Sequence, residues 1–141
     1  MSGYLLDTNV IIDLGDLKQP RHAKVRRWFD GVPAGELRTC TIVIGELARG
    51  IAYLSDGAKR RRFEHYLHSV VIPSFPVLEF GLDATLRWGA FMGEGQRAGR
   101  TPPTDDAKIA AVAAVHGLTV VTGNVADFAP LGVPCLDPAQ P

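Results

Sequence analysis

The sequence predicts an α/β domain in which a mainly parallel sheet lies between two layers of helices. Three observations support this: short apolar runs alternate with longer helical stretches, turn-forming residues separate them, and acidic residues directly follow or flank the apolar runs. Strands separated by helices generally pair in parallel and are covered on both faces. With 141 residues, 46% of them hydrophobic, the chain suits one well-buried core, so we expect a single domain over residues 1–141.

The first half of the chain is expected to contain two strands and three helices. Apolar residues recur at helical spacing after Pro20 and after Thr41, and Gly31 and the segment 55–57 interrupt the pattern. Thr41 is a suitable N-cap, because its hydroxyl can accept a hydrogen bond from a free backbone N–H. The predicted strands are Tyr4–Leu6 and Leu37–Cys40, and the predicted helices cover 20–29, the stretch from Thr41 to Leu54, and 58–69.

The second half is expected to contain two long helices and three strands. Pro73 and Pro76 interrupt a strand region that begins at Val70, and glycines weaken the end of the first long helix. Thr104 is expected to cap the second long helix, which Gly117 ends. The predicted strands are 70–72 with a continuation at 77–78, 118–121 and 133–136; the predicted helices are 82–98 and 105–116; and 123–131 is predicted to be a loop.

Charge and composition limit the kinds of partner. Fifteen basic residues balance fifteen acidic residues, so any binding of nucleic acid must use a local patch. The two cysteines, Cys40 and Cys135, lack metal-ligand spacing and fit a reduced intracellular protein. No apolar run approaches the roughly 20 residues that span a bilayer, and no secretory leader is recognisable. We therefore expect a soluble cytoplasmic protein without a membrane partner.

Acidic residues follow predicted strand ends or lie on predicted helices near them. Because the carboxyl ends of parallel strands meet at one edge of a sheet, these carboxylates should lie close together. Clustered carboxylates repel one another unless they share protons or surround a cation, and hard divalent ions bind such oxygens. The candidates are Asp7 after the first strand, Glu46 on the second helix, Asp106 in the first turn of the last long helix, and Asp127 beyond the last main strand.

Each acid also has an ordinary structural interpretation. Asp7 could form an Asx turn, Glu46 could pair with Arg49 at i+3, and Asp106 could simply stabilise the start of its helix. Four candidates at one edge of the sheet favour a metal site over these separate explanations.

Four segments together resemble one known family. The chain is similar to PIN-domain ribonucleases, and specifically to toxins of the VapBC toxin–antitoxin type, nearly from end to end. This resemblance implies a PIN-like three-layer fold and a type II toxin that hydrolyses RNA with metal-activated water. The segments are Leu5-Leu6-Asp7-Thr8-Asn9-Val10, Glu46-Leu47-Ala48-Arg49-Gly50-Ile51, Asp106-Ala107-Lys108-Ile109-Ala110-Ala111 and Thr122-Gly123-Asn124-Val125-Ala126-Asp127-Phe128.

The resemblance also implies roles for individual residues. Asp7, Glu46 and Asp106 would bind Mg²⁺ or Mn²⁺, and either Asn124 or Asp127 would complete the catalytic site. The polar residues that would support these ligands are Thr8, Asn9, Thr122 and Asn124.

Two positions depart from the usual family pattern. Gly45 stands where a serine often precedes the glutamate, and Gly123 stands where a basic residue is often found. One polar support and one phosphate contact are therefore expected to be missing. RNA would have to be held by other basic residues; the candidates for contact with RNA or antitoxin are Arg49, Arg97 and Arg100, with the cluster 59–62 as a second basic patch.

The partners implied by the resemblance are an RNA substrate, a cognate antitoxin and a second copy of the chain. Antitoxin and dimer contacts are expected on the glycine-interrupted helix around 88–99 and on the helix that begins at Ala58. The four histidines show neither triad nor zinc spacing, and no catalytic role is expected for them.

Two other functions fit parts of the pattern. A haloacid-dehalogenase-type phosphatase also has its nucleophilic aspartate after the first strand, but it has a second aspartate two residues later, where this chain has Asn9. A PIN-like module that binds RNA or protein without cleavage would keep the fold but would have no physical need for clustered carboxylates. A melting temperature that ignores Mg²⁺ and Mn²⁺ would favour the binding module.

Overall fold

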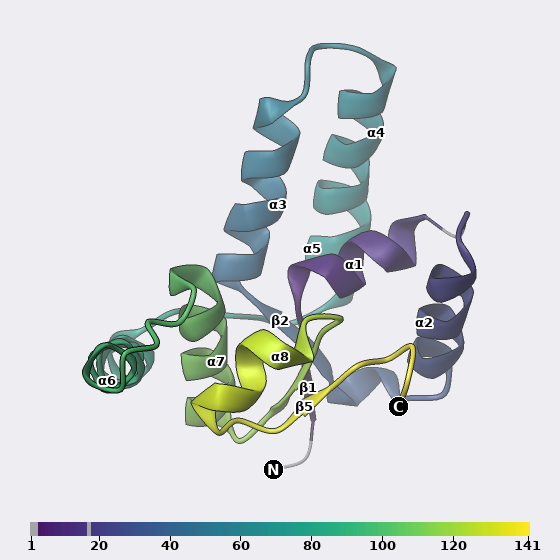
Figure 1. Cartoon of the computed structure of the whole chain (residues 1–141). Helices are drawn as coiled ribbons and strands as arrows, with labels where there is room; N and C mark the ends of the chain where they lie inside the picture. Colours follow the sequence, from purple (N-terminus) through teal and green to yellow (C-terminus); the bar gives the residue numbers. More distant parts are fainter. Residues whose placement is uncertain (1–2, 17) are drawn as a thin grey trace.

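The computed structural model describes residues 3–16 and 18–141 (Figure 1). Its centre is a parallel sheet with the strand order β3-β2-β1-β4-β5. Helices flank this sheet, which confirms the predicted α/β class and the parallel, three-layer arrangement. The strands are β1 (Tyr4–Leu6), β2 (Leu37–Cys40), β3 (Val77–Leu78), β4 (Thr119–Val121) and β5 (Cys135–Leu136).

The strand order places a topological switch point at the carboxyl edge of the sheet. From β1 the chain first builds outward through β2 and β3, and then adds β4 and β5 on the other side of β1. Connections that leave β1 and β4 therefore diverge, and ligands of open α/β sheets bind at such a switch point. Asp7 directly follows β1 and Thr122 directly follows β4, so both residues lie at this position.

Helices on either side of the sheet carry the remaining candidate residues. The helices α3 and α4 form a hairpin that projects beyond the sheet (Figure 1). Among the residues described, no helix combines the length and the apolar character needed to cross a membrane. The bounds are α1 (Thr8–Gly15), α2 (Pro20–Asp30), η1 (Ala34–Glu36), α3 (Thr41–Tyr53), α4 (Ala58–His65), η2 (Tyr66–Val71), α5 (Ile72–Ser74), α6 (Leu82–Arg97), α7 (Thr104–His116), α8 (Val125–Phe128) and η3 (Ala129–Leu131).

The helix α7 lies at the centre of the core. Its residues 107 and 109–113 are completely buried, because α7 packs against α3, α6, α8 and β4. Four of these six side chains are alanines, which allow neighbouring elements to approach closely while the larger Ile109 and Val112 fill the space between them. The buried body of α7 fixes the position of its first turn, where Asp106 is found.

Two predicted elements differ from the structure. The predicted strand 70–72 is helical, because the chain continues from α4 through the π-helix η2, which buries Leu67 and Val71 one turn apart. Pro73 is accommodated because it falls in the first turn of α5, where no helical hydrogen bond from its nitrogen is needed. The predicted loop 123–131 contains the short helices α8 and η3.

The predicted N-caps are also displaced by one residue. Thr41 and Thr104 are the first residues of α3 and α7, and the N-cap positions belong to Cys40 and Pro103. The Thr41 hydroxyl instead accepts a hydrogen bond from the backbone N–H of Phe80 at 3.2 Å, so it joins α3 to the segment after β3. The helix ends at Gly31 and Gly117 are confirmed, and Gly117 adopts the left-handed conformation with φ 65°.

The π-helix supplies a testable contact with α1. The Tyr66 hydroxyl donates to the backbone carbonyl of Ile11 at 2.6 Å, and burial raises the Tyr66 pKa to about 12, which keeps it protonated. We expect Tyr66→Phe to lower the free energy of unfolding by about 1 kcal/mol, the usual contribution of such a bond. Urea denaturation measures this, with Tyr53→Phe as the control because Tyr53 is 91% exposed. Equal stabilities of the two variants would contradict the docking of η2 on α1.

Candidate active site

Asp7 is a buried carboxylate that three donors hold in one orientation. The residue is only 3% exposed. Its Oδ1 accepts a hydrogen bond from the backbone N–H of Thr8 at 2.8 Å, which also caps the start of α1. Its Oδ2 accepts hydrogen bonds from the Thr122 hydroxyl at 2.8 Å and from the Asn9 side-chain amide at 3.0 Å. The predicted Asx-type contact with Thr8 is therefore present, together with long-range bonds that a simple turn does not require.

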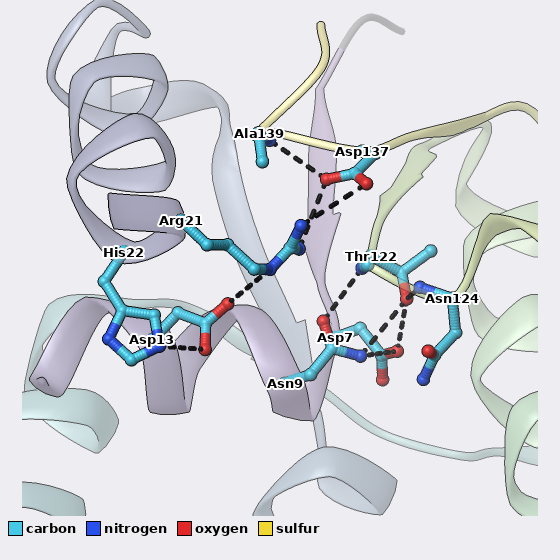
Figure 2. A network of polar contacts seen from close by, with 10 residues as sticks. Asp7, Asn9, Asp13, Arg21, His22, Thr122, Asn124, Asp137 and Ala139 are labelled. Carbon is cyan, nitrogen blue, oxygen red and sulfur yellow. Dashed lines mark hydrogen bonds and ion pairs between the residues drawn. The ribbon is translucent and has the colours of Figure 1, made fainter. Parts of the chain in front are cut away.

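The bonds around Asp7 connect α1 to the segment after β4 (Figure 2). The Asn9 amide also approaches the Thr122 hydroxyl at 3.3 Å, while its Oδ1 accepts from the backbone N–H of Gly123 at 2.9 Å. The Thr122 hydroxyl accepts a further bond from the backbone N–H of Asn124 at 3.0 Å. Asn9 thus bridges the two loops of the switch point, and both of its polar atoms are used.

The other acids approach Asp7 from three different helices. Glu46 lies on α3, and its Oε1 accepts a hydrogen bond from the Thr8 hydroxyl at 2.7 Å. Asp106 lies in the first turn of α7 and is partly buried, and Asp127 lies on α8 and is exposed. The structure therefore brings the four predicted acids to the same edge of the sheet, although they are far apart in the sequence.

Burial and mutual repulsion disfavour ionisation of these acids. Burial is the main cause that raises the pKa of Asp106 to about 6, and the charges of Asp7, Asp127, Glu46 and Asp105 raise it further. Burial also raises the pKa of Glu46, where Asp7 and Asp105 add to the effect and the hydrogen bond from Thr8 opposes it.

The pKa of Asp7 is raised as well, despite its three hydrogen bonds. Burial is the largest cause, and the charge of Asp127 contributes in the same direction. Cys40, the last residue of β2, lies close enough for Asp7 and Glu46 to add to the burial that raises its thiol pKa to about 11. A common negative field therefore covers the carboxyl ends of β1 and β2.

Nearby protein charge only partly balances the acidic cluster. In residues 3–16 and 18–141, none of Asp7, Glu46, Asp106 and Asp127 forms a salt bridge. The charge of Arg49 lowers the pKa of Glu46, but Arg49 forms no direct contact with its carboxylate. The alternative of a Glu46–Arg49 ion pair is therefore not observed among the described residues. A divalent cation is the chemically matched compensation for oxygen ligands of this kind.

The donor set suits a hydrated cation better than a closed cage. Within the described chain, no three Asp, Glu, His or Cys side chains are already arranged to hold one ion. Magnesium retains several water molecules and needs few carboxylates, so a few separated acids around an open crevice are compatible with it. The residues present therefore offer the oxygen donors that a hard divalent cation prefers.

The predicted basic residues lie at different distances from this cluster. Arg49 and Glu46 line the same groove of about 220 Å³, together with Asp105. Arg100 and Asp127 line a second groove of about 350 Å³, whereas Arg97, the last residue of α6, is exposed and does not line it. In the cluster 59–62, Arg60 is occupied by Asp56, Glu64 and the carbonyl of Leu54.

Sequence reasoning missed a polar network that lies beside Asn9. Asp13 on α1 contacts both Arg21 and His22 of α2, and Arg21 also reaches Asp137 after β5 (Figure 2). The Arg21–Asp137 contact spans 116 residues of sequence, so no local motif could reveal it. The one local signal is the i,i+4 spacing of Asn9 and Asp13, which places them on one face of α1.

The sequence profile described as the PIN domain matches residues 4–129. The chain belongs to the PIN-domain family. This PIN domain is 32% identical to the VapC ribonuclease Y4jK of Sinorhizobium fredii, over 97% of this chain and 98% of that protein. The resemblance to VapC-type PIN domains stated above is thereby confirmed.

Solved structures agree with the family assignment. The crystal structure of FitAcB from Neisseria gonorrhoeae resembles this PIN domain with a TM-score of 0.87 and 28% identity, over 96% of this chain and 97% of that chain. The DNA-bound VapBC from Salmonella typhimurium gives a TM-score of 0.82 and 25% identity, over 98% and 99% of the two chains. The family match over residues 4–129 includes all of the elements that carry Asp7, Glu46, Asp106 and Asp127.

Because burial and repulsion disfavour the ionised acids, removing one of these charges should stabilise the metal-free protein. Because the folded-state pKa of Asp106 is raised from 3.8 to about 6, stability is lost as pH rises through that range. We expect Asp106→Asn to raise the melting temperature of metal-free protein by a few degrees at pH 7.5 and much less at pH 4.5. Scanning calorimetry in chelator measures both.

The matched control is Asp83→Asn, which removes an exposed first-turn acid from α6. The Asp83 carboxylate interacts favourably with the dipole of α6, so its removal should lower the melting temperature slightly. If Asp106→Asn were as destabilising as Asp83→Asn at pH 7.5, repulsion within the cluster would be refuted.

Proposed function

We propose that this PIN domain is the toxin of a type II toxin–antitoxin pair and that it acts as a Mg²⁺- or Mn²⁺-dependent endoribonuclease. The observation that carries the proposal is the acidic cluster around buried Asp7 at the β1/β4 switch point, whose acids form no salt bridge within the described residues. A structural carboxylate would normally be neutralised by a neighbouring base, whereas a cation would supply the missing positive charge here.

The relatives support the same function. One is named a VapC ribonuclease, and the Salmonella structure is a VapBC assembly bound to DNA. Similarity over nearly the full length of both proteins makes a shared activity the simplest interpretation.

Each side chain has a role in the proposed reaction. Asp7, Glu46 and Asp106 would hold the cation, which when bound would acidify a water molecule and offset negative charge on the phosphate. Asp127 is favoured over Asn124 as the fourth catalytic residue, because its charge acts on both Asp7 and Asp106. Thr8, Asn9 and Thr122 orient the carboxylates, and the backbone of Asn124 supports Thr122.

RNA would approach between the grooves on either side of the cluster. Negative phosphates and negative carboxylates repel each other, so substrate binding depends on the cation and on nearby bases. Arg49 and Arg100 are the proposed phosphate contacts, because each lines a groove that also contains an acid of the site. Arg97 lines neither groove, so it would contact RNA only at the periphery.

The apolar groove between α3 and α4 is the proposed antitoxin site. It measures about 260 Å³ and begins at Thr8 and Glu46, beside the acidic cluster. Its walls include Leu47, Ile51 and Phe63. An amphipathic antitoxin segment could bury apolar side chains there and direct a basic residue toward Glu46. A homodimer, which the family resemblance implies, is part of the same proposal.

Loss of a proposed ligand should abolish cleavage without unfolding the chain. We expect Asp7→Asn and Asp106→Asn each to lower the rate of RNA cleavage at least about 10²-fold. Cleavage of a mixed RNA substrate with Mg²⁺ or Mn²⁺, followed by sequencing of the new ends, measures the rate and identifies the site. Asp83→Asn should cleave like the unmodified protein.

The melting temperature provides a second readout of the proposed site. Mn²⁺ should raise the melting temperature of the unmodified protein and have little effect on the melting temperature of Asp7→Asn. Indifference of the unmodified protein to both metals would favour the non-catalytic binding module, and undiminished cleavage by Asp106→Asn would refute its assigned role.

Antitoxin binding is separable from catalysis. Ile51→Lys places a charge in the apolar groove, so we expect at least about a tenfold loss of affinity for the cognate antitoxin while RNA cleavage persists. Titration calorimetry with the purified antitoxin measures the affinity. Tyr53→Lys, at an exposed position outside the groove, should bind normally. Full inhibition of Ile51→Lys at ordinary antitoxin concentrations would place the antitoxin elsewhere.

A further inference from the structure

Gly123 leaves space that the side chain of Arg21 occupies. A Cβ atom at position 123 would lie 2.5 Å from Arg21 Nη2 and 3.3 Å from Arg21 Cζ. The backbone of Gly123 does not adopt the left-handed conformation that favours glycine, so the guanidinium is the obstacle to a larger residue. The space beside the backbone at this position is therefore taken by an arginine from α2.

Arg21 is fixed by carboxylates on two separate elements. Its Nε lies 3.2 Å from Asp13 Oδ2 on α1, and its Nη2 lies 3.2 Å from Asp137 Oδ1 after β5. Both carboxylates are mostly buried and have further partners: Asp13 contacts His22 Nε2 at 3.2 Å, and Asp137 accepts from the backbone N–H of Ala139 at 3.0 Å. The planar guanidinium thus acts as a rigid brace between α1 and the C-terminal segment.

The brace adjoins the hydrogen bonds that orient Asp7 (Figure 2). Gly123 packs against the guanidinium and donates its N–H to Asn9 Oδ1, while the amide of Asn9 donates to Asp7 Oδ2. Asn9 and Asp13 are one turn apart on α1, so Arg21 holds that face of the helix through Asp13 and confines the Gly123 backbone opposite Asn9.

We propose that Arg21 is a positioning residue, which fixes the distance between α1 and the Gly123 backbone and thereby holds the Asn9 bridge and the Asp7 carboxylate in the geometry needed for metal binding. The inference rests on the proposed metal-dependent nuclease and adds a residue outside its acidic cluster. Two carboxylates already occupy the nitrogens of Arg21, so it differs from the exposed bases that would bind RNA phosphates.

Mutations at the two ends of this contact separate positioning from other roles. Arg21→Ala removes the brace, whereas Gly123→Ala keeps every ion-pairing group but pushes the guanidinium away from Asp137. Arg21→Lys keeps the charge without the planar fork. Arg26→Ala is the matched control, because Arg26 lies on the same helix but contacts Asp30 and the ring of Phe29 instead of Asp13, Gly123 or Asp137.

The experiment measures Mn²⁺ affinity by titration calorimetry and kcat and KM for RNA cleavage. Arg21→Ala and Gly123→Ala should each weaken Mn²⁺ binding about tenfold and lower kcat, as outer-shell changes commonly do, with KM for RNA unchanged. The double variant should be no worse than the more impaired single variant, because both changes disturb one contact. Arg21→Lys should recover only part of the loss, and Arg26→Ala should behave like the unmodified protein.

Hydrogen exchange gives a readout that needs neither metal nor activity. In chelator, the Gly123 amide should exchange faster in Arg21→Ala than in the unmodified protein, because its bond to Asn9 is no longer confined. If the unmodified protein cleaves no RNA, only the proposed nuclease function is refuted. Hydrogen exchange at Gly123 and the Mn²⁺ affinity still test the positioning role of Arg21 in that case.

Three results would overturn the inference. Unchanged Mn²⁺ affinity in Gly123→Ala would do so even if Arg21→Ala failed to fold. Independent, multiplicative losses in the double variant would show that the two residues do not act through one contact. A raised KM in Arg21→Ala, with the salt dependence of RNA binding reduced by about one charge, would identify Arg21 as a direct phosphate contact instead.

Discussion

The structure depends on the burial of one carboxylate, that of Asp7, at the point where the sheet changes its direction of winding. A buried carboxylate is unfavourable unless donors surround it. Here the donors come from both diverging loops: Thr8 and Asn9 after β1, and Thr122 after β4. The requirement to satisfy Asp7 therefore ties together two segments more than 100 residues apart, and these segments form the floor of the proposed site.

The remaining acids make this site less stable than a purely structural one. Glu46, Asp106 and Asp127 add negative charge around a group that is already hard to ionise. Burial raises the pKa of Asp106 to about 6, and the charges of Asp7, Asp127 and Glu46 raise it further. Such repulsion remains in a fold only when the surrounding core compensates for it. The fully buried body of α7 supplies that core beneath Asp106, so packing and electrostatic cost occur on the same helix.

The Arg21 brace shows how distant polar groups can define the geometry of a small site. It joins α1, α2 and the segment after β5 beside the Asn9 bridge, where hydrophobic packing alone would not fix hydrogen-bond distances. Among the described residues, no base forms a salt bridge with an acid of the cluster, whereas the brace contains a paired arginine. Keeping the arginine outside the acidic cluster is physically useful, because a base placed directly among the acids would compete with the cation.

The sequence was sufficient to predict the fold class, the helix ends at Gly31 and Gly117, and the four acids that the structure brings to one edge. These features follow from local rules: apolar periodicity, glycine conformation, and the fact that parallel strands end at the same edge. It did not reveal that 70–72 is helical, because a short apolar run fits a strand and a buried helix equally well. The Asn9–Gly123 bridge and the Arg21 brace depend on contacts between distant residues, which no local pattern encodes. The absence of an ion pair at Glu46 within the described chain likewise emerges only from the folded arrangement.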